Sequence, residues 1–205
     1  MSIRYNVVND ITNMDQKYVN TFDPYYIYSS IKSDDIACIG TDCNCGSFLW
    51  DGLQVLVDYG GKKMFVNPSL SCGSTITKNN HRSMIDITSI YTIDDYIPFV
   101  TYTDFPNGKK VEIDYIKEAI WYGLPVVTGI SIQDSYNDVS PPRAQYGPSS
   151  SNAITGRHAV CIIGFDDNRD GGSFQIMNSW GSDWGDEGFF WMSYNDYEKY
   201  VDDAW

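Results

Sequence analysis

The sequence predicts an α+β fold in which helices dominate the first half and strands the second. Segments with apolar side chains at helical spacing lie mainly before residue 61, and one more covers residues 111–123. After residue 124 the apolar side chains alternate with polar ones, as in strands that bury one face. No internal repeat or low-complexity tract interrupts this order. Helices and strands that are segregated in this way are typical of the α+β class.

Two helices are predicted before residue 33. Residues 2–12 carry apolar side chains at helical spacing, namely Ile3, Val7, Val8 and Ile11. They start without a capping residue, so they are interpreted as the later turns of a longer helix. Residues 23–32 predict a short helix with Asp23 at the N-cap and Pro24 at the first helical position.

Residues 47–61 predict a further helix. Ser47 is the expected N-cap, and Gly60 and Gly61 end the helix. Its apolar stripe consists of Leu49, Leu53 and Leu56. Residues 62–110 are rich in Ser, Thr, Asn and Asp and predict irregular structure with short strands.

The second half begins with an amphipathic helix over residues 111–123, which turns Ile113, Ile116 and Ile120 inward. A strand over residues 124–133 follows. Residues 135–156 then form a long loop, whose Pro, Ser and Gly content suits a functional loop on a rigid frame. The remaining predicted strands cover residues 158–165 and 173–180, and a glycine-rich segment and residues 188–194 follow them. The acidic tail after them is expected to be a solvated surface segment with aromatic anchors.

The turn at residues 166–172 imitates the start of a calcium loop. Asp166, Asn168 and Asp170 stand at the spacing of the first three ligands. Met177, however, stands where that loop needs a glutamate, so a polar hairpin turn is predicted instead.

The chain is strongly acidic. It has 27 Asp and Glu against 14 Lys and Arg in 205 residues, a net charge of −13. Such a surface repels phosphate groups, which argues against nucleic acid and anionic membranes as partners. No apolar run approaches the roughly 20 residues of a membrane span, and the first ten residues lack the apolar core of a signal peptide. The five cysteines lack zinc-finger spacing, so no metal or other cofactor is expected.

Two polar residues on neighbouring strands are candidates for catalysis. His158, one of only two histidines, opens the strand over residues 158–165, and Asn178 lies near the end of the next strand. The asparagine carbonyl can accept a proton from one imidazole nitrogen, which leaves the other nitrogen to deprotonate a thiol. Trp180 is expected to cover this bond and keep water off it. The other histidine, His81, lies in a polar loop and is expected to be solvated.

The stretch around these residues resembles the papain-like (C1) cysteine peptidases, in a bacterial-type variant. Their histidine lies in Gly-x-His-Ala-Val and their asparagine in Asn-Ser-Trp-Gly-x-x-Trp-Gly-x-x-Gly. Residues 156–160 and 178–188 match both patterns. Residues 41–61 also resemble the family's Cys-Asn-Gly-Gly segment and the helix after it, with Cys45 in place of the first glycine.

The resemblance implies a papain-like fold with a helical left half, residues 1–105, a β-rich right half, residues 106–205, and a cleft between them. It implies peptide-bond hydrolysis on peptide or protein substrates by thiolate acyl transfer. His158 would be the catalytic base and Asn178 its orienter, while Gly46 would present its backbone to an extended substrate. A secreted, periplasmic or lysosome-like compartment would suit the family.

The nucleophile of the family lies at the start of a long central helix, shortly after a glutamine. Residues 2–12 resemble the later turns of that helix and hold no cysteine. The nucleophile is therefore expected upstream of Met1, and the chain alone is expected to be inactive. Cys45 is the alternative nucleophile because it precedes a helix, whose N-terminus lowers a thiol pKa.

The other cysteines have structural interpretations. The resemblance suggests a disulfide between Cys38 and Cys72 and leaves Cys43 free. Cys161 lies in a strand and is most simply a small core residue. A central helix without its first turns would leave apolar surface uncovered, so self-association through the left half is expected.

Three hypotheses on function remain. The first is a cysteine peptidase whose nucleophile lies upstream of this chain. The second is a non-catalytic papain-like homologue that binds peptides, and the third is a structural domain with a remnant site.

Overall fold

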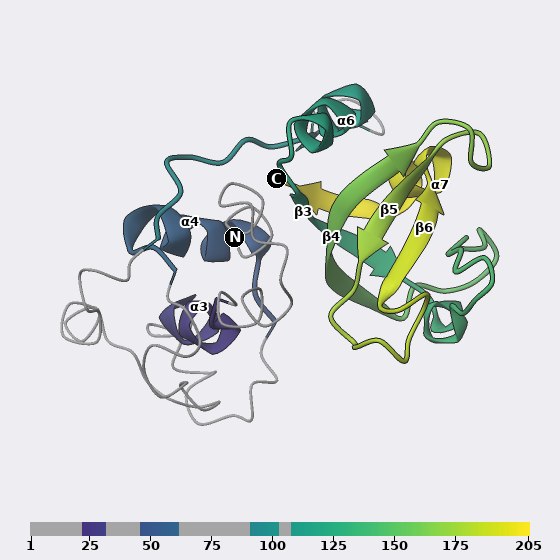
Figure 1. Ribbon diagram of the computed structural model, residues 1–205, viewed down its shortest axis with the longest axis horizontal. Coiled ribbons are helices and arrows are strands. Elements are labelled where there is room, and N and C mark those ends of the chain that lie inside the picture. Colours follow the sequence, from purple (N-terminus) through teal and green to yellow (C-terminus); the bar gives the residue numbers. More distant parts are fainter. Residues whose placement is uncertain (1–21, 32–45, 62–90, 103–107) are drawn as a thin grey trace. The chain divides into compact units, whose positions relative to one another are not determined.

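The computed structural model describes residues 22–31, 46–61, 91–102 and 108–205. The chain divides into two compact units, Met1–Tyr96 and Ile97–Trp205. Their described parts contain helices, a two-stranded sheet and a five-stranded antiparallel sheet (Figure 1), so the α+β prediction is confirmed. The helix predicted over residues 2–12 and the half boundary predicted at residue 105 lie outside the described residues and stay predictions. The same holds for self-association through the left half.

Two helices pack on each other in the first unit. They are α3 (Pro24–Ile31) and α4 (Leu49–Asp58), and Gly52 of α4 faces Ile27 and Ile31 of α3. None of the helices in the described ranges is long and apolar enough to cross a bilayer.

The start of α3 agrees with the sequence, and the start of α4 does not. Asp23 Oδ1 accepts the backbone N–H groups of Tyr25 and Tyr26, at 2.9 and 3.4 Å, as an N-cap does. The prediction of Ser47 as the cap of α4 is wrong. The cap position belongs to Phe48, whose side chain makes no capping hydrogen bond. Ser47 lies one residue too early because the helix begins at Leu49.

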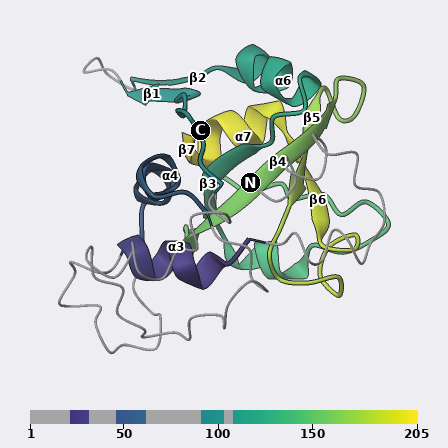
Figure 2. The same ribbon diagram turned by 60° about the vertical axis from the view of Figure 1, so that its left-hand side comes forward.

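The second unit is built on an antiparallel sheet with the strand order β6–β5–β4–β3–β7. Its strands are β3 (Val126–Ile132), β4 (Gly156–Asp166), β5 (Ser173–Met177), β6 (Phe189–Ser193) and β7 (Val201–Ala204). Strands β3 to β6 follow one another along the chain. Strand β7 returns to the far edge and pairs with β3 (Figures 1 and 2). The strands predicted over residues 124–133, 158–165 and 173–180 are confirmed.

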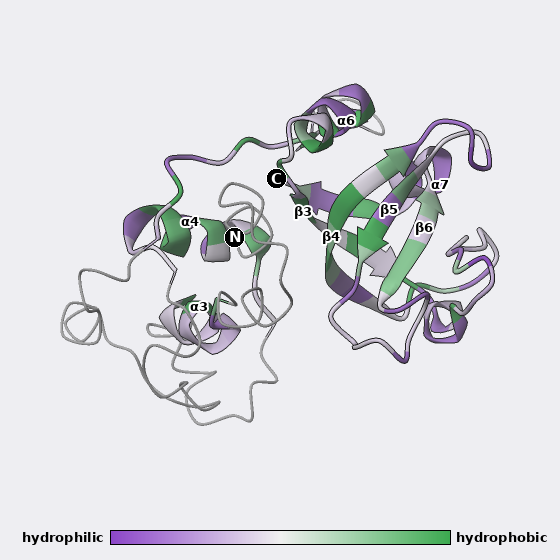
Figure 3. Ribbon diagram, in the orientation of Figure 1, coloured by the Kyte–Doolittle hydropathy of each residue, from purple (hydrophilic) through white to green (hydrophobic). Residues whose placement is uncertain are grey.

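One face of this sheet forms the core of the second unit. Side chains alternate along each strand, so every second residue shares a face. The buried side chains of this face are Val126, Thr128, Ile130, Val160, Ile162, Phe174, Ile176, Phe190 and Met192. In Figure 3 the strand β4 carries a long hydrophobic stretch. His158 belongs to the same face, at its end, where it stands opposite Ile130 of β3.

A helix and a hairpin accompany the sheet. The hairpin pairs β1 (Val100–Tyr102) with β2 (Lys109–Val111), and α6 (Ile113–Trp121) follows it. Ile116 of α6 is fully buried in the same core as the sheet. The inward stripe predicted for this helix is therefore confirmed.

The expectation of a solvated tail with aromatic anchors is confirmed for the anchor Tyr197 and wrong for the rest of the segment, which folds onto the sheet. The tail forms α7 (Tyr194–Tyr200) and then β7. Three of its side chains are buried, namely Tyr197, Val201 and Ala204. The many acidic residues around them made the segment look uniformly polar in the sequence. Burial raises the pKa of the Tyr197 phenol.

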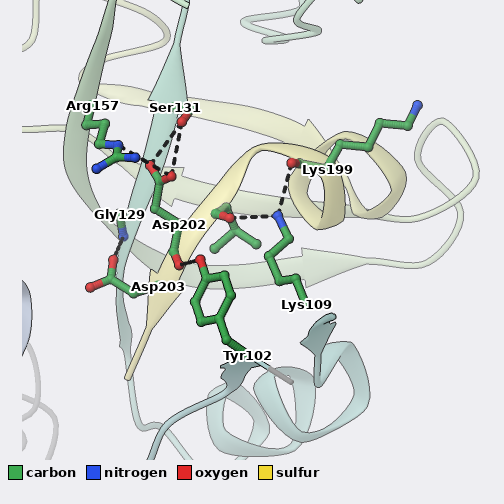
Figure 4. Close-up of polar contacts among 9 residues, drawn as sticks. Tyr102, Lys109, Gly129, Ser131, Arg157, Lys199, Asp202 and Asp203 are labelled. Carbon is green, nitrogen blue, oxygen red and sulfur yellow. Dashed lines mark hydrogen bonds and ion pairs between the residues drawn. The ribbon is translucent and has the colours of Figure 1, made fainter. Parts of the chain in front are cut away.

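Polar contacts fasten β7 to the rest of the unit (Figure 4). Asp203 Oδ1 accepts the backbone N–H of Gly129 at 3.1 Å, where the pairing of β3 with β7 is irregular. The hydroxyl of Ser131 donates to the carboxylate of Asp202 at 3.0 Å. Lys109 Nζ donates to the carbonyl oxygens of Lys199 and Val201, at 3.0 and 2.8 Å. These bonds tie β2, β3, α7 and β7 together.

Candidate active site

Strands β4 and β5 bring His158 and Asn178 together. Cys161 pairs with Met177, the last residue of β5, so the next residue, Asn178, points back toward the beginning of β4. His158 lies diagonally across from Asn178 on the same face, within reach of a side-chain contact. His158 Nε2 lies 2.7 Å from Asn178 Oδ1.

A second contact fixes the imidazole tautomer. The backbone N–H of Ser179 donates to the same oxygen, Asn178 Oδ1, at 2.7 Å. A backbone N–H can only donate, so this atom must be the carbonyl oxygen of the amide. An oxygen without a hydrogen can only accept from His158 Nε2, so that nitrogen carries the proton. In the neutral ring Nδ1 then has a free lone pair, which is what a general base needs.

The turn after β5 holds Asn178 in place. The backbone N–H of Asn178 donates to the carbonyl of Gly188 at 2.9 Å, and that of Gly185 donates to Val139 at 3.1 Å. Gly185 has φ +63°, and a Cβ there would collide with the carbonyl oxygen of Phe189. Glycine is therefore required for the turn to close. Asn178 is 8% exposed, and its Nδ2 has no hydrogen-bond partner among the described residues.

Aromatic rings surround the imidazole. The ring centroids of His158 and Trp180 lie 5.0 Å apart, and those of His158 and Tyr136 lie 5.6 Å apart. Trp180 is 44% exposed, so one side of its ring remains in contact with solvent. Its other neighbours include Trp184, at 5.5 Å between centroids. Such a shell lowers the access of water to the hydrogen bond between His158 and Asn178.

Tyr136 is the residue of this shell that the sequence reasoning missed. It lies in the 3-10 helix η3 (Asp134–Asp138), it is fully buried, and its carbonyl accepts the indole N–H of Trp184 at 3.2 Å. Burial raises the pKa of its phenol, whose oxygen has no hydrogen-bond partner within the part of the chain that the structure describes. The only sequence signal was an aromatic residue inside a loop already singled out as functional.

Cys161 does not face His158. The two residues are three positions apart in β4, so their side chains lie on opposite faces. Burial raises the pKa of the Cys161 thiol to about 11, which keeps it protonated at neutral pH. Cys161 is therefore excluded as the partner of the imidazole. It is half-buried and lies outside the core cluster, so the prediction of a core residue is wrong.

Gly46 lies in the first unit, shortly before α4. It is exposed, and a Cβ there would meet no atom within 4 Å. Cys38, Cys43, Cys45 and Cys72 lie outside the described residues, as does His81. The suggested disulfide and the alternative nucleophile therefore stay predictions.

The turn between β4 and β5 is a polar turn, as predicted. Asp166 Oδ1 accepts the backbone N–H of Asn168 at 2.9 Å, which uses the carboxylate inside the turn. No group of three or more His, Cys, Asp or Glu side chains that could hold a metal occurs in residues 22–31, 46–61, 91–102 or 108–205.

A family model described as papain family cysteine protease matches residues 71–202. The chain belongs to the papain family of cysteine proteases. The matched residues include His158, Asn178 and Trp180, whereas Gly46 lies outside them.

Similar proteins agree with this assignment. The chain is 35% identical over 130 residues to an uncharacterized peptidase C1-like protein of Acanthamoeba polyphaga mimivirus, covering 62% of this chain and 35% of that one. It is 33% identical over 86 residues to the cathepsin B-like cysteine proteinase 3 of Ostertagia ostertagi, covering 42% of this chain and 45% of that one. The chain thus matches less than half the length of these papain-family relatives.

Solved structures confirm the papain-like fold. Xylellain, a cysteine protease from Xylella fastidiosa, superposes with a TM-score of 0.68 at 20% sequence identity. The alignment covers 100% of this chain and 74% of xylellain.

Proposed function

We propose that this chain supplies the base and the orienting amide of a papain-family cysteine peptidase. The observation that carries the proposal is the arrangement around Asn178 Oδ1. This oxygen accepts from both His158 Nε2 and the Ser179 backbone N–H, so Nδ1 of the imidazole can accept a proton.

The proposed reaction is acyl transfer to a cysteine thiol. His158 Nδ1 takes the thiol proton, and the thiolate attacks the carbonyl carbon of the scissile peptide bond. The imidazolium then gives its proton to the departing amine, and the acyl group remains on sulfur as a thioester. Water, deprotonated by the same nitrogen, hydrolyses the thioester and restores the thiol. Asn178 holds the ring through these steps because its carbonyl accepts from Nε2 in both charge states of the imidazole.

We place the thiol in a segment N-terminal to residue 1 of this sequence. Cys161 faces away from His158, and residues 1–37 contain no cysteine. The resemblance to the family puts the nucleophile before the Cys-Asn-Gly-Gly-like segment. Cys45 is the alternative, and a peptide-binding homologue without turnover is the second candidate function, favoured because Cys161, the cysteine that the described residues include, does not face the ring.

The test compares the 205-residue chain with a form that includes the preceding coding sequence. Both are incubated with fluorogenic peptides under reducing conditions, with and without a thiol-directed covalent inhibitor. We expect hydrolysis only from the longer form, with the inhibitor bound to a cysteine before residue 1. His158→Ala should abolish hydrolysis, and His81→Ala should leave it unchanged.

Two outcomes would contradict the proposal. Turnover by the 205-residue chain that disappears in Cys45→Ser would make Cys45 the nucleophile. Peptide binding without hydrolysis by the longer form would favour the non-catalytic homologue.

A further inference from the structure

The outer face of α6 and its C-cap residue expose three large aromatic side chains. Tyr115, Trp121 and Tyr122 keep 60%, 79% and 67% of their surface in contact with solvent. Scattered exposed apolar residues are ordinary, but several aromatic rings gathered on one short helix mark an interaction surface. None of the three rings packs on another aromatic ring within the described residues.

The helical register places these rings on one side with two carboxylates between them. At 3.6 residues per turn, Asp114, Tyr115, Glu118 and Trp121 fall within an arc of about 120°, and Tyr122 follows as the C-cap residue. All five are exposed. The opposite side carries the apolar stripe that includes the fully buried Ile116. In Figure 3, α6 shows both hydrophobic and hydrophilic positions, as expected of a helix with two different sides.

The carboxylates of this outer face are not neutralised by the cations near them. Lys110 pairs with Glu112 at 2.5 Å, and Lys117 pairs with Asp167 in the turn after β4 at 2.8 Å. Asp114 and Glu118 take part in no ion pair with any residue that the structure describes. The outer face therefore combines negative charge with exposed aromatic rings.

We propose that the outer face of α6 is a docking surface for a basic segment of another protein. A Lys or Arg side chain can stack on the face of an aromatic ring while a neighbouring carboxylate balances its charge. A second copy of this chain would bring its own net charge of −13, and an anionic membrane would be repelled by the two carboxylates. Charge complementarity thus selects a cationic protein segment.

The test uses the full chain and a short fluorescently labelled peptide of alternating arginine and leucine. Binding is followed by fluorescence anisotropy, which does not depend on catalysis. We expect Trp121→Ala and Glu118→Gln each to weaken binding by about two- to fivefold, the size of an exposed cation–π contact. Trp121→Phe should retain much of the affinity because it keeps a ring, and added salt should weaken binding.

The matched controls lie on other helices. Glu198→Gln on α7 changes the net charge by the same amount, and Phe48→Ala removes another exposed ring, before α4. Both should bind like the parent chain, and thermal melts should show that every variant is folded. Equal weakening by Glu198→Gln would overturn the proposal, because the effect would be one of net charge.

Further results would overturn it as well. One is equal binding of a peptide with glutamate in place of arginine. Another is a concentration-dependent dimer, detected by light scattering, that Trp121→Ala dissolves, because the occupant would then be a second copy. Binding to neutral lipid vesicles that requires Trp121 would identify a membrane surface instead.

Discussion

Replacing Asn178 with alanine should allow the neutral imidazole of His158 to adopt either tautomer. In the parent chain Nε2 lies 2.7 Å from Asn178 Oδ1, and the Ser179 N–H identifies that atom as an acceptor. The Nε2–H form therefore gains a hydrogen bond that the Nδ1–H form cannot make. Alanine removes the acceptor, so both forms of the neutral ring become accessible.

The size of the effect follows from the single bond involved. A hydrogen bond in a folded protein contributes about 0.5–1.5 kcal/mol net, which corresponds to a shift of about 2- to 13-fold in the tautomer equilibrium. The surrounding rings of Trp180 and Tyr136 keep water from replacing the lost acceptor fully, which favours the upper part of this range.

Nitrogen NMR of histidine-labelled protein measures the tautomer directly. The chain has only two histidines, so His81→Gln leaves His158 as the sole signal. Spectra are taken at a pH where the ring is neutral, and the shifts of Nδ1 and Nε2 report which one is protonated. Asn178→Asp is the matched control, because a carboxylate oxygen still accepts from Nε2 and from Ser179.

Two results would refute the reasoning. The first is a parent chain in which Nδ1 carries the proton, because Asn178 would then not select the tautomer. The second is an unchanged tautomer ratio in Asn178→Ala, which would show that the aromatic shell or the backbone orients the ring without the amide.

Three further predictions concern the turn, the β7 contacts and the thiol of Cys161. Gly171→Ala places a side chain in open space at φ +81° and should lower the free energy of unfolding by about 1–2 kcal/mol in urea titrations. Gly185→Ala adds a collision with a backbone carbonyl, so it should lower the free energy of unfolding clearly more. Lys109→Met removes two hydrogen bonds to carbonyl oxygens and should lower the free energy of unfolding by about 1–2 kcal/mol. Lys110→Met, at the exposed neighbour, should change this free energy little. Equal effects of the two variants would contradict the contacts of Lys109. The thiol of Cys161, with its pKa raised to about 11 from 9.0, should react with iodoacetamide about a hundredfold more slowly at pH 8 than after unfolding in urea, as peptide mapping by mass spectrometry would show.

The second half of the fold was predictable because its apolar pattern is regular. Alternation along residues 158–165 and 173–180 located two strands, and a hairpin between them was enough to place His158 near Asn178. The motif around Asn178 supplied the family. These signals are local in sequence, and the position of His158 near Asn178 depends only on the hairpin that joins their two strands.

The features that were missed depend on contacts between distant segments. The tail was interpreted as solvated because its acids dominate the composition, whereas Tyr197, Val201 and Ala204 decide its packing. Tyr136 reaches the imidazole only because residues 134–155 fold back on the turn after Asn178. The cap of α4 was misplaced because the helix begins two residues after Ser47, and no local signal marks that position.

The pairing of β7 with β3 at the edge of the sheet also bears on the order in which contacts form during folding. His158 and Asn178 are 20 residues apart along the chain, whereas Thr128 and Asp203, which join β3 to β7, are 75 apart. Longer loops close at a higher entropic cost, so contacts within the β4–β5 hairpin form ahead of those between β3 and β7. During refolding the base and its orienting amide can therefore meet while the outer edge of β3 is still unpaired. In that interval the open edge of β3 is exposed to strand addition from another chain.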